Sequence, residues 1–200
     1  QNLISFKRSS LPTGICMIFV TEDGQRTMAA NLGANLDINE SVLNPDKLKI
    51  ADYLLFDNFS LSSKNGLSTV IAALREKANS QVCFGVSDES LVTDHLKNLK
   101  WLSQNKIDLI FGNHQEITKL KSEISLFAYN VLETNGENGA SYNGKLVPAP
   151  KIDIVNSNGA GDALIGTFLA LKDKYDEATA LFKSVGYASR VCRVNGPRLI

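Results

Sequence analysis

Apolar residues recur along this chain with two different spacings, and the spacing changes near residue 45. Residues 13–21 are rich in β-branched and apolar side chains, Glu22-Asp23-Gly24 has the composition of a turn, and residues 25–30 can return as a partner strand. The first part of the chain is therefore predicted to form a β-hairpin.

From Pro45 onward, short apolar strands alternate with amphipathic helices. Strands are predicted at residues 52–56, 81–86, 107–111 and 129–133, and helices at 62–78, 88–101, 163–171 and 176–194. A second hairpin is predicted at Asn143-Gly144. This alternation indicates an α/β fold with a doubly wound, mostly parallel sheet and helices on both faces. Ligands of such sheets bind beyond the carboxyl ends of the strands, so those ends are the places to search for a site.

Length and charge narrow the class of protein. A chain of 200 residues with 44% hydrophobic residues can bury one substantial core, so we predict a single domain over residues 1–200. Lysine plus arginine and aspartate plus glutamate both number 21. This balance predicts neither a nucleic acid nor an anionic membrane as partner. A small-molecule ligand is therefore expected. No stretch approaches the ~18 apolar residues of a membrane span.

The three cysteines suggest a cellular compartment. Cys16, Cys83 and Cys192 are odd in number, far apart and set among apolar residues. This pattern fits reduced, buried thiols better than a disulfide framework or a zinc site. The sequence therefore predicts a cytoplasmic protein.

The strongest candidate for chemistry is the run of small residues that ends at Asp162. Gly159, Ala160 and Gly161 precede an apolar helix and leave little side-chain bulk, so backbone N–H groups without intrahelical partners can face an anion. The helix dipole favours the Asp162 carboxylate, which would nevertheless repel a bound phosphate. A carboxylate in that place can accept the proton of an attacking hydroxyl. The alternative is an ordinary helix N-terminus with an Asn or Ser cap.

Polar residues also follow two of the predicted strands and the last helix. Asn113 and Glu116 follow one strand, and their spacing of three is also that of a capping box. After the next strand come Thr134, Gly136 and Gly139, which a simple turn would equally explain. Asn195 and Gly196 follow the last helix, where they can either line a site or serve as the C-terminal cap of that helix. His95 and His114 are interpreted as bystanders.

The segment Asn158-Gly159-Ala160-Gly161-Asp162 resembles the signature of the ribokinase-like (PfkB) family of sugar and nucleoside kinases, and of its adenosine kinase branch in particular. The resemblance implies that Asp162 is the catalytic base and that the backbone of Gly159, Ala160 and Gly161 forms an anion hole. It also implies ATP and Mg²⁺ as cofactors. Asn156-Ser157 stands where the family usually has Asp-Thr, which leaves dependence on a monovalent cation open.

The other motifs resemble the same family and occur in its order. Asn113 and Glu116 match the Asn-x-x-Glu motif associated with magnesium and nucleotide phosphates, so Glu116 is expected to organise a hydrated Mg²⁺. Thr134, Gly136 and Gly139 match the nucleotide-binding turn, and Asn195 is expected to line the same end of the site.

The start of the chain departs from the family. The family's Gly-Gly substrate motif and much of its β lid are not recognisable before Thr13, and the chain does not begin with Met. We therefore expect that an N-terminal segment and much of the lid are missing here. The run Arg26-Thr27-Met28 resembles the adenosine kinase branch, although the solvent face of a strand would also explain its polar residues.

The function expected from this resemblance is ATP-dependent transfer of a phosphoryl group to a primary hydroxyl of a nucleoside or sugar. The substrate would be a small molecule, and the protein a monomer or homodimer. Two alternatives remain at this point. One is a sugar kinase of the ribokinase or fructokinase kind, and the other is a nucleotide-binding protein of the same fold without turnover.

Overall fold

The computed structural model describes residues 8–20, 26–63, 65–104, 107–123, 130–196 and 199. It divides into two compact units, Gln1–Ser80 and Gln81–Ile200. The single domain over residues 1–200 stays a prediction.

The first unit contains the predicted hairpin. Strands β1 (Ile15–Val20) and β2 (Arg26–Asn31) pair antiparallel, with Ile15 opposite Asn31 and Val20 opposite Arg26. The predicted turn Glu22-Asp23-Gly24 and the side chain of Arg26 lie outside the described residues. Thr27 is exposed, and so is Met28. The hairpin prediction is confirmed.

The rest of the first unit is helical around one strand. Its elements are η1 (Gly33–Asp37), η2 (Glu40–Val42), α1 (Pro45–Ile50), β3 (Tyr53–Asp57), η3 (Asn58–Leu61) and α2 (Gly66–Glu76). Helix α2 begins four residues later than predicted, because Asp57 caps the 3₁₀ turn η3 by accepting a hydrogen bond from the Ser60 N–H (2.9 Å). A Cβ at Gly66 would lie 2.2 Å from the Ser60 carbonyl oxygen, so only glycine fits this junction.

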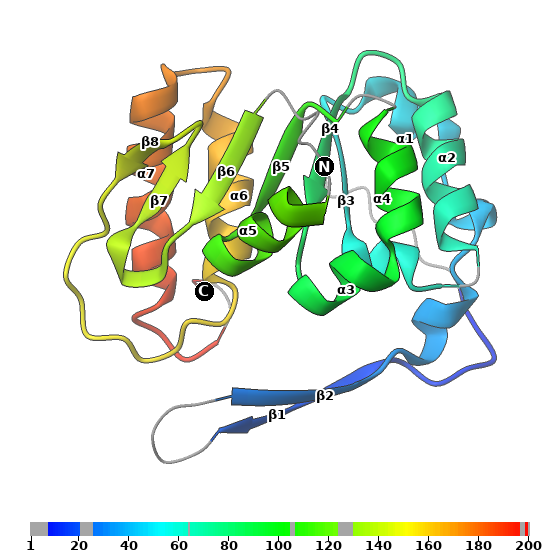
Figure 1. Cartoon of the computed structure of the whole chain (residues 1–200), viewed down its shortest axis with the longest axis horizontal. Helices are drawn as coiled ribbons and strands as arrows, with labels where there is room; N and C mark the ends of the chain where they lie inside the picture. The colour runs from blue at the N-terminus through cyan, green and yellow to red at the C-terminus, as the bar shows by residue number, and fades with distance from the viewer. Residues whose placement is uncertain are drawn as a thin grey trace. The chain divides into compact units, whose positions relative to one another are not determined.

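The second unit holds the sheet that carries the candidate site (Figure 1). Its elements are β4 (Gln81–Gly85), α3 (Glu89–Asp94), α4 (Leu96–Ser103), β5 (Leu109–Asn113), α5 (His114–Glu123), β6 (Asn130–Thr134), η4 (Gly136–Asn138), β7 (Ala140–Tyr142), β8 (Lys145–Val147), α6 (Ala160–Leu171) and α7 (Glu177–Val191). Strands β4, β5 and β6 are parallel neighbours, and β7 and β8 continue the sheet antiparallel.

Helices cover both faces of this sheet. Figure 1 shows α5 on one face of β5 and β6, with α6 and α7 on the other. The side chains of Leu120, Leu132 and Phe168, from α5, β6 and α6, are fully buried, and the rings of Phe168 and Tyr142 lie 4.8 Å apart. The predicted α/β fold with a mostly parallel sheet is confirmed.

Two local predictions in this unit have different outcomes. The turn at Asn143 (φ 51°) and Gly144 (φ 80°) joins β7 to β8 with the two positive φ angles of a type I′ hairpin, as predicted. The single helix predicted at residues 88–101 is instead two helices, α3 and α4. They are separated by His95, whose backbone leaves the helical region (φ −102°, ψ 12°). Among the residues that the structure describes, no helix is long and apolar enough to cross a membrane.

The cysteine prediction is correct for Cys83 and wrong for Cys16. Cys83 is buried in β4 and Cys192 is half-buried. Cys16 is exposed because it lies in the two-stranded ladder, where Ile15 and Met17 are exposed too. Burial raises the pKa of Cys83 to about 11 and also raises the pKa of Cys192.

This difference predicts selective thiol modification. A thiol reacts as the thiolate, which Cys83 reaches only at strongly alkaline pH. A disulfide reagent at neutral pH should therefore modify Cys16 rapidly and Cys83 only after unfolding. The rate at which the reagent's own thiol is released measures the modification. Cys16→Ser is the control, because it should remove the fast phase of that release. A fast phase that persists in Cys16→Ser and disappears in Cys83→Ser would contradict the assignment.

Candidate active site

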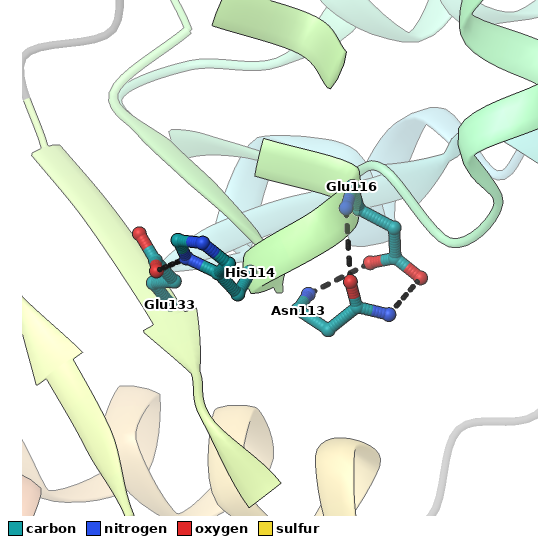
Figure 2. Close-up of polar contacts among 4 residues, drawn as sticks. All are labelled: Asn113, His114, Glu116 and Glu133. Atoms are coloured by element: carbon teal, nitrogen blue, oxygen red, sulfur yellow. Dashed lines mark hydrogen bonds and ion pairs between the residues drawn. The ribbon is translucent and has the colours of Figure 1, made fainter. Parts of the chain in front are cut away.

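Asn113 and Glu116 meet where β5 passes into α5 (Figure 2). The backbone N–H of Asn113 donates to Glu116 Oε2 (2.8 Å), and its side-chain Nδ2 donates to Oε1 (2.8 Å). In return the Glu116 N–H donates to Asn113 Oδ1 (2.9 Å). This is the reciprocal arrangement of a capping box with one additional side-chain bond. Both predicted residues therefore lie together and in fixed orientations at the carboxyl end of β5.

The surroundings of Glu116 disfavour its ionised form. Its pKa is raised by burial, while the backbone hydrogen bond from Asn113 opposes this shift, and the negative charges of Asp88 and Glu89 add to it. The carboxylate also needs space, because a Cβ at Gly112 would lie 2.7 Å from Glu116 Oε2. A divalent cation close to this carboxylate would oppose the effects of burial and of the two neighbouring negative charges, since it stabilises the ionised form.

Thr134 lies beside Asn113 because β5 and β6 are parallel and in register. The two residues are opposite one another at the last paired position of the two strands. Beyond Thr134 the chain turns through η4, where the Asn135 N–H donates to the Gly139 carbonyl (2.8 Å) and the Gly139 N–H donates to the Gly136 carbonyl (3.1 Å). The predicted magnesium and nucleotide motifs are thus neighbours.

The two glycines of this turn have different surroundings. Gly139 has φ 99°, and a Cβ there would lie 2.0 Å from the Val147 carbonyl oxygen, so this glycine is required by the fold. Gly136 also has a positive φ (57°), but a Cβ there would meet nothing within 4 Å. Gly136 therefore presents open backbone at the carboxyl end of the sheet, where a ligand can approach closely.

Sequence reasoning missed a contact in this corner. His114, interpreted as a bystander, lies with Nδ1 2.6 Å from Oε1 of Glu133, 19 residues along the chain. Glu133 is the residue of β6 that lies opposite Gly112 in the register. Only the pairing of β5 with β6 brings these two side chains together, so no local signal could have found them.

The predicted anion hole forms the first turn of α6. Gly159 adopts the left-handed conformation (φ 77°, ψ 0°), which favours glycine, and it precedes the helix without a side-chain cap. The Ala160 N–H donates to the Ser157 carbonyl oxygen (3.3 Å), so this member of the predicted anion hole already has an acceptor, whereas the N–H groups of Gly161 and Asp162 have none among the described residues. The Asp162 carboxylate is exposed and likewise makes no hydrogen bond or ion pair within the described part of the chain. Unsatisfied amides beside an unpaired carboxylate suit a bound anion next to a base.

The loop before this turn is anchored to the end of α7. The N–H groups of Val155 and Asn156 both donate to the Cys192 carbonyl oxygen, at 2.9 and 3.1 Å. The Asn156 side chain then accepts a bond from the Asn158 N–H (2.9 Å). Asn195, three residues beyond Cys192, is exposed. The structure thus brings Asn113, Glu116 and the turn from Thr134 to Gly139 together at the strand ends. It ties the loop that leads to Gly159 and Asp162 to the end of α7, the helix that Asn195 follows in the chain.

Within the described ranges, no three His, Cys, Asp or Glu side chains gather closely enough to hold a metal ion by themselves. Mg²⁺ commonly binds through one or two carboxylates and completes its shell with water and phosphate oxygens. Glu116 beside the amide of Asn113 therefore fits a hydrated, nucleotide-bound magnesium ion better than a metal held entirely by protein.

The family of the chain follows from a comparison with family models. The model of the pfkB family of carbohydrate kinases matches residues 6–199. The chain belongs to this family.

Among curated relatives, adenosine kinase 2 of Arabidopsis thaliana is 23% identical over 95% of this chain and 64% of its own length. A probable sugar kinase from Rhizobium etli CFN 42 superposes with a TM-score of 0.88, at 24% identity over 98% of this chain and 66% of that one. A putative ribokinase II from E. coli, solved in complex with ATP and Mg²⁺, superposes with a TM-score of 0.78, at 20% identity over 90% of this chain and 65% of that one. The solved structures confirm the ribokinase-like fold. The chain spans about two thirds of the length of these relatives.

Proposed function

We propose that this protein is an ATP-dependent kinase that transfers the γ-phosphoryl group of Mg·ATP to a primary hydroxyl of a nucleoside or sugar. The observation that carries the proposal is the first turn of α6, where the amides of Gly161 and Asp162 lack acceptors within the described residues and the Asp162 carboxylate is exposed. Membership of the pfkB family and the ATP and magnesium named for the E. coli relative support it.

In the proposed reaction, Asp162 accepts the proton of the substrate hydroxyl as that oxygen attacks the γ-phosphorus. The bond from the γ-phosphorus to the β–γ bridging oxygen breaks, and ADP leaves. The amides of Gly161 and Asp162 hold the charge that develops on the phosphoryl oxygens. Bound magnesium would neutralise charge on the nucleotide phosphates, with Glu116 and Asn113 as the residues that hold its water shell. We assign Thr134, Gly136 and Gly139 to nucleotide binding, and Asn195 to the far wall of that site.

Two classes of acceptor are compatible with the relatives. The curated Arabidopsis relative is an adenosine kinase, and the Rhizobium relative is a probable sugar kinase. The run Arg26-Thr27-Met28 favours a nucleoside. We propose adenosine as the first substrate to test. We also propose that the protein works in a reducing compartment such as the cytoplasm, because its three cysteines are free thiols.

The test is a substrate screen with Mg·ATP across adenosine, inosine, ribose, fructose and fructose phosphates, with ADP release and phosphorylated product as readouts. We expect turnover with one class of acceptor and none without it. Binding of a non-hydrolysable ATP analogue with no turnover on any acceptor would favour a nucleotide-binding protein of the same fold instead.

Thr134→Val tests the assignment of the β6 turn to the nucleotide. The substitution keeps the branched shape that suits a strand and removes a hydroxyl that makes no hydrogen bond within the described residues. We expect the KM for ATP to rise by about 2- to 10-fold, the effect of one hydrogen bond, while the KM for the acceptor changes little. Thr118→Val, on the exposed side of α5, is the matched control. An effect confined to the acceptor's KM would reject the assignment.

A further inference from the structure

We propose that His114 and Glu133 form a positioning pair that fixes the ends of β5 and β6 against each other, so that Asn113 and Thr134 engage one nucleotide together. This inference rests on the proposed function for its kinetic readout. Neither residue is assigned to the catalytic machinery above. Figure 2 shows His114 reaching from the first turn of α5 toward Glu133 on β6, on the other side of the turn from the Asn113–Glu116 box.

The contact is a short one between groups of unequal exposure. His114 Nδ1 and Glu133 Oε1 are 2.6 Å apart, and the side chain of Glu133 is 16% exposed whereas that of His114 is 71% exposed. An ionised carboxylate only accepts hydrogen bonds, so the contact requires the proton on Nδ1 of the imidazole. The ring therefore serves as the donor that satisfies a largely covered carboxylate.

The pair lies directly beside the two residues, Asn113 and Thr134, that it is proposed to position. Asn113 and Thr134 are the last paired residues of β5 and β6. Beyond them, the first strand continues into α5 and the second into the turn that contains η4. His114 directly follows Asn113, and Glu133 directly precedes Thr134. The side-chain bond thus crosses the same two strands at the point where the backbone ladder stops.

Strand geometry separates this tie from the residue that it positions. Successive side chains of a strand point to opposite faces of the sheet, so Glu133 and Thr134 face away from each other. A bond made by Glu133 on one face fixes the strand end while leaving Thr134 unobstructed on the other. The side-chain bonds of the Asn113–Glu116 box join these two residues to each other at the start of α5, and among the described residues none of these bonds reaches β6.

The test compares His114→Ala with His114→Asn in the full chain. The side-chain amide nitrogen of asparagine is attached to Cγ, as Nδ1 of histidine is, so asparagine keeps an N–H donor for Glu133, whereas alanine removes it. We expect His114→Ala to raise the KM for ATP by about 3- to 10-fold, the range of one ordinary intramolecular hydrogen bond, with kcat within about twofold of the parent. His114→Asn should recover most of the loss. Gln115→Ala, an exposed neighbour on the same turn, is the matched control.

A double-mutant cycle with Glu133→Ala completes the test. If the two residues act as a pair, the double variant should lose no more ATP affinity than the worse single variant. A lower melting temperature with an unchanged KM for ATP in His114→Ala would overturn the inference, because the pair would then support only stability.

Binding of Mg·AMP-PNP, measured by calorimetry, separates this inference from the proposed function. If the parent binds the analogue and phosphorylates none of the acceptors, the proposed function fails and the His114 variants are compared by their dissociation constants. If the parent shows neither binding nor turnover, both proposals are wrong. Normal affinity in His114→Ala, with an active parent, overturns the positioning pair alone.

Discussion

Asp162→Asn is expected to lower kcat by at least about two orders of magnitude, because assistance by a general base is worth ~10²–10⁴-fold. Asparagine keeps the size of the side chain and its place in the first turn of α6, and it removes only the basic carboxylate. The carboxylate makes no hydrogen bond or ion pair within the described residues, so its loss should leave the packing of α6 unchanged.

ATP binding should survive this substitution. The N–H groups of Gly161 and Asp162 belong to the backbone, so the substitution leaves them in place. Without the negative charge of the carboxylate beside them, they should bind phosphate at least as tightly as in the parent. If Asp162 serves only the helix dipole, the expected result is the reverse, a stability loss of roughly 0.3–1 kcal/mol with normal turnover.

The matched control is Glu177→Gln, which removes an acidic residue from the first turn of α7 without touching the candidate site. It should reproduce the small dipole effect and leave kcat unchanged. Turnover, affinity for ATP and melting temperature, measured on each preparation, separate the two roles. A near-normal kcat in Asp162→Asn would show that another group accepts the proton.

Glu116→Gln is expected to weaken the use of magnesium by about 10- to 100-fold, the usual cost of losing a group that orients a metal's ligands. The activity should fall most at low Mg²⁺ and recover in part as Mg²⁺ is raised. A titration of kcat/KM against Mg²⁺ at fixed ATP measures this directly.

The stability of the same variant should change little, because two effects oppose each other. Glutamine keeps one acceptor oxygen, so one of the two bonds from Asn113 is lost, within the ~0.5–2 kcal/mol of a cap. The raised pKa of Glu116 means that the folded state binds its proton more tightly than the unfolded chain does. That contribution to stability is present below the unfolded pKa and is lost as the pH rises through the folded value, so at neutral pH a neutral glutamine avoids the cost.

Asp176→Ala is the control for the capping role of Glu116, since Asp176 caps α7 by accepting from the Thr179 N–H (3.0 Å). It should lower the melting temperature without changing the response to Mg²⁺. If the Mg²⁺ dependence of Glu116→Gln matches that of the parent at every concentration, Glu116 has only the structural role of a capping box.

The sequence by itself determined the features that depend on neighbouring residues. Asn143-Gly144 specified its hairpin turn because both positions need positive φ, and the alternation of apolar segments specified the α/β class. The spacing of Asn113 and Glu116, which is also that of a capping box, anticipated their mutual hydrogen bonds. These are local preferences of the backbone, and each extends over a few residues.

Tertiary structure decided which of these local features meet. Thr134 lies opposite Asn113, and Glu133 reaches His114, only because β5 and β6 pair in one particular register. Asn156 is held at the end of α7 by the Cys192 carbonyl, and Cys16 is exposed within the two-stranded ladder of β1 and β2. Register and burial are set by the packing of whole faces against one another, a sum over many distant residues that no window of sequence contains.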